Sequence, residues 1–119
     1  MGHRDVNVQG QPHTVLMVKL RKGSGTKPEH RYADRFLTPA EFQWESQAST
    51  KLESAKGRHI TQHDAEGRRV HLFTRYDDRD DFVYCGTLHY LRHEGEQPMR
   101  VWWRLDVELP EGLWRLWKG

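Results

Sequence analysis

The sequence predicts a mostly β domain of the α+β class, a small β-barrel or strongly curved sheet with one or two short helices. Three observations support this fold class. Short segments with alternating polar and apolar residues recur along the chain, turn residues separate them at intervals of about 8–12 residues, and helical signals are confined to two short stretches. With 119 residues, the chain is long enough for one domain with a single modest core.

The expected elements begin with strands. Residues 1–12 are polar and turn-prone, so we expect a loose lead-in before a single domain that covers residues 13–119. The first strand is predicted at 14–22, where β-branched and apolar residues follow one another without a helix or strand breaker. A glycine-rich loop follows, and two further strands are predicted at 30–37 and 41–45.

The helical signals lie in the middle and at the end of the chain. Thr50 and Glu53 match a capping box and Gly57 suits a C-cap, which predicts a helix of about two turns. A short amphipathic helix is expected after Pro110, where apolar side chains recur with helical spacing. Its Trp114 and Trp117 are expected to be structural, as are Trp102 and Trp103.

Two hairpins are predicted between these helices. The first joins residues 59–63 to 69–75 across the turn at 64–67. The second joins 82–91 to 99–109 across the turn at 93–96.

The composition predicts a small core rich in aromatic side chains. Hydrophobic residues make up 35% of the chain and charged residues 30%, and five Trp, four Tyr and four Phe offset the scarcity of aliphatic residues. The net charge of +2 excludes a histone-like polycation. Basic residues gather in segments 19–27 and 51–69 and acidic residues in segment 77–81, a distribution that suits a polyanionic partner and ordinary surface ion pairs equally.

The single cysteine, Cys85, excludes a disulfide framework and a multi-cysteine zinc site within the chain, and we expect it to pack as a small apolar side chain. The sequence has no apolar run long enough to cross a bilayer and no apolar segment of a signal peptide at its N-terminus. We therefore expect a soluble, cytoplasmic protein without a membrane partner.

The most informative pattern lies between residues 32 and 50. In extended strands, side chains alternate between faces, so three residues of each strand share one face. These sets are Tyr32, Asp34 and Phe36 in the first strand and Phe42, Trp44 and Ser46 in the second. Aromatic rings beside a carboxylate and a hydroxyl are the parts of a pocket for a nucleobase. From the residues alone, a barrel core capped by small polar side chains is the favoured interpretation.

Several motifs in this order are similar to one known family. They are Tyr-x-Asp-x-Phe at 32–36, Phe-x-Trp-x-Ser-Gln-x-x-Thr at 42–50, Ile-x-x-His at 60–63 and Leu-Phe-x-Arg at 72–75. The order resembles the DUF3427 family, the C-terminal domain of bacterial superfamily II helicases, often found behind a phospholipase-D-type nuclease. The resemblance spans about residues 14–117, although no helicase or nuclease domain accompanies it in this chain.

The resemblance implies a non-enzymatic DNA-reading module of PUA-like or SRA-like type. Such a module would recognise a modified base, 5-methylcytosine above all, by flipping it into an aromatic pocket. In modification-dependent (type IV) restriction and phage defence, it would target helicase or nuclease domains, in cis or in trans, to double-stranded DNA that carries the modified base.

Ten site residues follow from this resemblance. The base pocket is expected to contain Tyr32, Asp34, Trp44, Ser46 and Gln47, and the contacts to the DNA backbone are expected from Lys51, Arg58, His63, Arg68 and Arg75. Tyr32 and Trp44 would supply ring faces and Asp34 would accept the N4 amino group of cytosine. Ser46 and Gln47 would reach O2, N3 or a phosphate. Taken alone, Asp34 is more simply a strand-end cap or the ion-pair partner of a neighbouring arginine.

The eight histidines raise the possibility of a metal or nuclease site. On the predicted strand, His59 and His63 would lie about 13 Å apart, and no cysteine or carboxylate completes a recognisable ligand set. The sequence also lacks a nucleophile–base pairing and a phosphate-cradling glycine loop. We therefore expect no cofactor, no metal and no catalytic role. Two alternatives stay open, a protein-interaction or regulatory domain that docks on a helicase, and non-specific binding of single-stranded nucleic acid.

Overall fold

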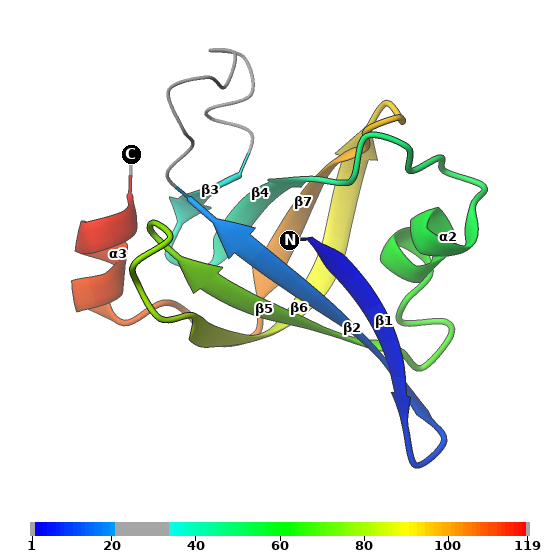
Figure 1. Cartoon of the computed structure of the whole chain (residues 1–119), viewed down its shortest axis with the longest axis horizontal. Helices are drawn as coiled ribbons and strands as arrows, with labels where there is room; N and C mark the ends of the chain where they lie inside the picture. Colours follow the sequence, from blue (N-terminus) through cyan, green and yellow to red (C-terminus); the bar gives the residue numbers. More distant parts are fainter. Residues whose placement is uncertain (1, 21–33, 119) are drawn as a thin grey trace.

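The computed structural model describes residues 2–20 and 34–118. These residues form a seven-stranded mixed sheet with the strand order β1-β2-β5-β6-β7-β4-β3 and two short helices (Figure 1). The strands are β1 (His3–Val8), β2 (Gln11–Lys19), β3 (Arg35–Thr38), β4 (Glu41–Glu45), β5 (Arg69–Arg75), β6 (Val83–Glu94) and β7 (Arg100–Leu105). The helices are α2 (Ala55–Thr61) and α3 (Glu111–Trp117). The mostly β fold class predicted from the sequence is confirmed.

Only the pair β2–β5 of this sheet is parallel, and the other neighbouring strands among the described residues are antiparallel. A parallel pair needs a long crossover connection. Here the connection contains β3, β4 and α2, and β4 pairs with β7, a strand far along the chain. Figure 1 shows the sheet strongly curved, with α2 beside β6 and α3 beside β3, in agreement with their contacts.

The core fills the inner face of the curved sheet. Alternate residues of β2 and β5 point inward, as the burial of Leu16, Val18, Val70 and Leu72 shows. From the other half of the sheet, buried side chains such as Trp103 complete the core. The remaining residues of β2 and β5 are half-buried or exposed on the outer face of the sheet.

The N-terminal segment corrects the first expectation. Residues His3–Val8, expected to be part of a loose lead-in, form strand β1 and pair antiparallel with β2. Gln9 and Gly10 both have positive φ angles, 51° and 84°, as a two-residue hairpin turn with the twist of the flanking strands requires. The sequence hides this strand because the side chains that β1 turns inward are the polar His3 and Asp5.

The predicted hairpin at 59–63 is wrong, because these residues belong to helix α2 and the loop after it. The N-cap is Ser54, whose hydroxyl accepts a hydrogen bond from the Gly57 backbone N–H. Thr50 therefore is not the cap, and Gly57 lies inside the helix instead of ending it. Gly57 is buried because the helix passes directly over the backbone of Lys51 and Leu52.

Most other predicted elements are confirmed. Strand β4 has the predicted bounds, the second hairpin is β6–β7, and the terminal helix is α3. The strand expected at 30–37 is described only as β3, since residues 30–33 lie outside the described part of the chain. Trp102 and Trp103 are both buried, and Cys85 is a buried free thiol. Neither described helix is long and apolar enough to cross a membrane.

The two helical glycines give a direct test of this packing. A Cβ atom at Gly57 would overlap the carbonyl oxygens of Lys51 and Leu52, whereas one at Gly112 in α3 would meet nothing within 4 Å. We expect Gly57→Ala to lower the free energy of unfolding by about 1–3 kcal/mol, since backbone must move. Gly112→Ala should be neutral or raise it by roughly 0.5–1 kcal/mol. Urea denaturation of both variants measures this; equal effects would contradict the position of α2.

Candidate functional site

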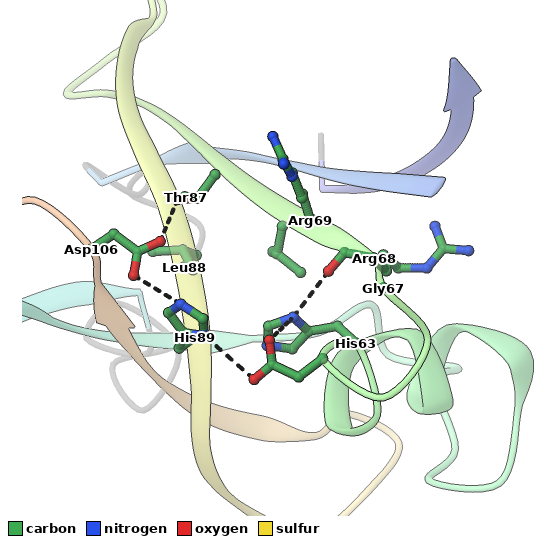
Figure 2. A pocket seen from close by; sticks show the side chains of 10 residues that line it. His63, Gly67, Arg68, Arg69, Thr87, Leu88, His89 and Asp106 are labelled. Atoms are coloured by element: carbon green, nitrogen blue, oxygen red, sulfur yellow. Dashed lines mark hydrogen bonds and ion pairs between the residues drawn. The ribbon is translucent and has the colours of Figure 1, made fainter. Parts of the chain in front are cut away.

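A pocket lies where β6 continues past the N-terminal end of its neighbour β5 (Figure 2). Its volume is about 410 Å³, in the range of sites for small ligands. The lining residues come from the α2–β5 connection, from β5 and β6, and from the segment after β7. They are His63, Asp64, Gly67, Arg68, Arg69, Val70, Thr87, Leu88, His89 and Asp106.

His63 closes the inner side of this pocket. The β5–β6 pairing ends at Val70↔Leu88, while β6 continues along β7, so the backbone of β6 loses a partner on one side. His63 takes that place: its Nε2 accepts a hydrogen bond from the Tyr90 backbone N–H at 3.0 Å, and its Nδ1 lies 3.2 Å from the carbonyl oxygen of Arg68. A neutral ring with its proton on Nδ1 satisfies both bonds. With 2% of its surface exposed, His63 is a fixed structural link.

His89 lies between two carboxylates on the open side of the pocket. Its Nδ1 is 3.4 Å from an Asp64 oxygen and its Nε2 is 2.9 Å from an Asp106 oxygen. The Thr87 hydroxyl donates a hydrogen bond to the second Asp106 oxygen, and Figure 2 shows these side chains facing one another across β6. This wall therefore offers carboxylate acceptors, which suit a ligand with exposed N–H donors.

Arg68 is held in place from behind the pocket. Its guanidinium donates to the carbonyl oxygen of His13 at 2.9 Å and lies 3.7 Å from a carboxylate oxygen of Asp5. Asp5 also accepts hydrogen bonds from Thr14 at 2.6 Å and His59 at 2.8 Å. Burial acts to raise the pKa of Asp5, but the hydrogen bonds from Thr14 and His59 outweigh it and lower this pKa to about 2. The ionised carboxylate thus joins β1, β2 and α2 to the pocket wall.

Two histidine–carboxylate groups have ligand atoms close enough for a metal ion, which corrects the expectation that no carboxylate completes such a set. They are His3 with Asp5 and His59, and His63 with Asp64 and His89. In the first group, the Arg68 guanidinium beside Asp5 opposes a second cation. In the second group, both nitrogens of His63 are engaged by the backbone. The contacts of both groups are those of hydrogen-bonded networks.

The structure treats the two residues expected to stack a base, Tyr32 and Trp44, differently: only Trp44 is among the residues it describes. Tyr32 lies outside the described residues. Trp44 is 2% exposed, and its ring contacts His3 and Trp103 with centroids 6.3 Å away in both cases. Trp44 therefore presents no free ring face in this structure. Stacking on it would require the core to open.

The polar residues of the expected base pocket lie at the ends of strands. An Asp34 oxygen accepts a hydrogen bond from the Glu45 backbone N–H at 2.8 Å, which ties the start of β3 to β4. The buried Ser46 hydroxyl accepts one from the Met99 N–H at 2.8 Å. Gln47 is exposed. Asp34 and Ser46 thus cap the backbone at the ends of strands, which for Asp34 is the simpler of the two interpretations given above. A contact of either residue to a base stays a prediction.

The residues expected at the DNA backbone separate into three places. Lys51 is exposed in the segment before α2, and Arg58 is exposed on α2 itself. His63 and Arg68 meet at the pocket in Figure 2, where His63 is buried and Arg68 is held by its network. Arg75 lies at the other end of β5, over the ring of Phe82 and near Asp78.

Sequence reasoning missed the residues that define the open wall of the pocket. Strand alternation places Thr87 and His89 on one face of β6, which was a usable signal. Their partners Asp64 and Asp106 come from two connections, each with ordinary turn composition. Only the strand order, in which β5 and β7 flank β6, brings these four residues together.

The exposed aromatic rings lie on another part of the surface. Among the Phe, Tyr and Trp residues that the structure describes, Tyr76 and Tyr84 are those with more than a third of their surface exposed, at 43% and 51%. Tyr84 lies on β6 directly opposite Phe73, with ring centroids 4.9 Å apart. Its hydroxyl is hydrogen-bonded to Nδ1 of His71 at 2.8 Å.

Comparison with known proteins agrees with this architecture. The family model described as Domain of unknown function (DUF3427) matches residues 5–116. Among solved structures, the chain is similar to the SRA domain of SUVH5, which was crystallised in complex with fully methylated CG DNA. The TM-score is 0.59 with 11% sequence identity, over 92% of this chain and 78% of that chain. The SRA-like fold expected from the sequence is thus confirmed. Comparison with curated proteins gives no match.

The network around Asp5 predicts a pH dependence of stability. Because the folded pKa of about 2 is below the ordinary value of 3.8, ionised Asp5 stabilises the fold above pH 4, and this contribution disappears as the pH falls toward 2. Asp5→Asn should lower the free energy of unfolding at pH 7 by about 1–2 kcal/mol, allowing for partial exposure. Denaturation at pH 7 and at pH 2.5 measures it.

The exposed Glu108 offers the matched control for this substitution. We expect Glu108→Gln to leave stability unchanged at neutral pH. A difference between Asp5→Asn and the unaltered protein that stayed constant from pH 7 to pH 2.5 would show that the ionisation of Asp5 is not the source of the effect.

Proposed function

The chain belongs to the DUF3427 family, and we propose that it is a DNA-binding module that recognises a modified base. The observation that carries the proposal is the pocket of Figure 2, where His89 on the central strand β6 of an SRA-like sheet lies between the carboxylates of Asp64 and Asp106. What the SUVH5 domain binds supports methylated CG DNA as the first ligand to test on this chain.

The pocket matches the chemistry of a flipped cytosine. The N4 amino group is a hydrogen-bond donor, and a carboxylate is its natural acceptor. Asp64 and Asp106 supply such acceptors, and His89, with one ring nitrogen facing each of them, holds the two carboxylates in place. Val70 and Leu88 form an apolar floor that suits a 5-methyl group. A single methyl group adds about 1–3 kcal/mol of discrimination at most.

Affinity must come mainly from the DNA backbone, since flipping a base costs a few kcal/mol. Arg69 lines the pocket, and Arg104 lies directly opposite His89 in the β6–β7 pairing. Cross-strand partners share a face of the sheet, so Arg104 flanks the pocket. Both arginines are exposed. We assign them the phosphate contacts, in place of the buried His63 and the network-bound Arg68.

The resemblance to helicase-associated domains supplies the biological role within this proposal. A module that reads a modified base and carries no reaction of its own would direct helicase or nuclease domains, in cis or in trans, to modified DNA. 5-Methylcytosine in double-stranded DNA is the mark we propose for it.

The carboxylates give the first test of base reading. Asp106→Asn replaces an acceptor oxygen by an amide donor that faces the base amino group, so the base should no longer be held in the pocket. Because the methyl group is sensed only there, the preference for methylated over unmethylated duplex should fall about tenfold. Fluorescence anisotropy on matched duplexes measures the ratio of the two affinities. Glu108→Gln removes the same charge two residues away and should leave the ratio unchanged. If Asp106→Asn and Asp64→Asn both kept the full preference, the pocket assignment would be wrong.

Arg104 tests the assignment of the backbone contacts. Arg104→Ala should weaken binding to methylated and unmethylated duplexes equally, and should reduce the slope of log K against log salt concentration by about 1. Arg115→Ala on α3 removes an exposed arginine that is paired with Glu111 and serves as the control. An Arg104→Ala variant with an unchanged salt slope would place the DNA on another surface.

A further inference from the structure

A stripe of aromatic rings crosses the outer face of the sheet beside the pocket. It consists of His13 on β2, His71 and Phe73 on β5, and Tyr84 on β6, and we call it the aromatic stripe. Neighbouring rings are in contact: the centroid distances are 5.1 Å for His13–His71, 5.8 Å for His71–Tyr84 and 4.9 Å for Phe73–Tyr84.

Hydrogen bonds fix the orientation of the two histidine rings and of Tyr84. Nδ1 of His13 is 2.9 Å from Nε2 of His71, and Nδ1 of His71 is 2.8 Å from the Tyr84 hydroxyl. Burial, followed by the charges of His13 and Arg69, lowers the pKa of His71, so this ring is neutral at pH 7. The stripe is therefore a connected set of uncharged rings at its centre, with Tyr84 half exposed.

The charges around the aromatic stripe are unevenly placed. Arg69 pairs with His13 across β2–β5, and Arg4 pairs with Val15 across β1–β2, so both exposed guanidinium groups lie on the face of the stripe. At the opposite end, the acidic segment 77–81 follows β5, and Asp78 forms ion pairs with Lys19 and Arg75. An extended polyanion would therefore run past Arg4 and Arg69.

The aromatic stripe is also continuous with the base pocket. His71 pairs directly with Thr87, which lines the pocket and binds Asp106. A DNA chain that delivers a base to the pocket would thus bring its neighbouring nucleotides to the rings.

We propose that the aromatic stripe binds unpaired nucleotides of a DNA strand, with bases stacked on Tyr84 and its neighbouring rings and phosphates beside Arg69 and Arg4. Exposed rings bind bases of any sequence because every base has a flat π-face. A duplex keeps its bases stacked on one another, so the rings favour single strands. The inference rests on the proposed function only in taking DNA as the ligand.

Binding of a fluorescein-labelled oligothymidylate, measured by fluorescence anisotropy, tests the proposal. The unaltered protein should bind the oligonucleotide, and Tyr84→Ala should weaken binding about fivefold or more, as expected for the loss of one stacked base. Tyr84→Phe keeps the ring and should stay within about twofold of the unaltered protein. Tyr76→Ala removes the other exposed tyrosine, which lies outside the stripe, and should also stay within about twofold.

Three results would overturn the proposal. They are no binding of the oligonucleotide by the unaltered protein, equal effects of Tyr84→Ala and Tyr76→Ala, and a loss confined to methylated duplex. Near-UV circular dichroism confirms that Tyr84→Ala is folded, and Arg69→Ala provides a second variant that should weaken oligonucleotide binding. The outcome is separate from that of the base pocket, because Asp106→Asn should lose the preference for methylated duplex and keep its binding of oligothymidylate.

Discussion

The buried imidazole of His63 is the constraint on which the pocket depends. Strand β6 is longer than its neighbour β5, so part of its backbone has no strand to pair with on that side. A buried backbone N–H without a hydrogen-bond partner would cost about 1–3 kcal/mol. His63 accepts that bond from Tyr90 and bonds the Arg68 carbonyl with its other nitrogen. The α2–β5 connection is thereby fixed against β6, so the next residue, Asp64, comes within reach of His89. The place where β6 lacks a neighbouring strand thus becomes the site at which Asp64 and His89 form a wall of the pocket.

Arg68 depends on a second set of polar contacts, centred on Asp5. This ionised carboxylate joins strand β1 and helix α2 to Arg68, although β1 contributes few apolar side chains to the core. Ion pairs at exposed sites contribute little stability, but Asp5 is partly buried and accepts several hydrogen bonds at once. One face of the sheet carries the base pocket with Arg69 and Arg104 beside it. Across the Thr87–His71 pair, the aromatic stripe lies on the same face.

The sequence predicted the strands with regular apolar alternation, such as β2, β4 and the β6–β7 hairpin, because the pattern and the packing agree there. It failed at β1 and α2 for physical reasons. Strand β1 turns polar side chains inward, and the glycine read as a helix end instead marks close backbone contact inside the helix. For the site, aromatic residues of 32–50 were the visible signal, yet Trp44 is core. Asp64, His89 and Asp106 meet only through strand order, which no local pattern encodes.

The most direct test of the account is to locate a methylated duplex on the protein by NMR. Amide chemical shifts of the isotopically labelled chain would be followed during titration with methylated and unmethylated duplexes of one sequence. The shifts specific to methylation should concentrate at Asp64, Thr87–His89 and Asp106, at the pocket of Figure 2. Methylation-specific shifts confined to β3 and β4, around Asp34 and Trp44, or identical shifts with both duplexes, would contradict it.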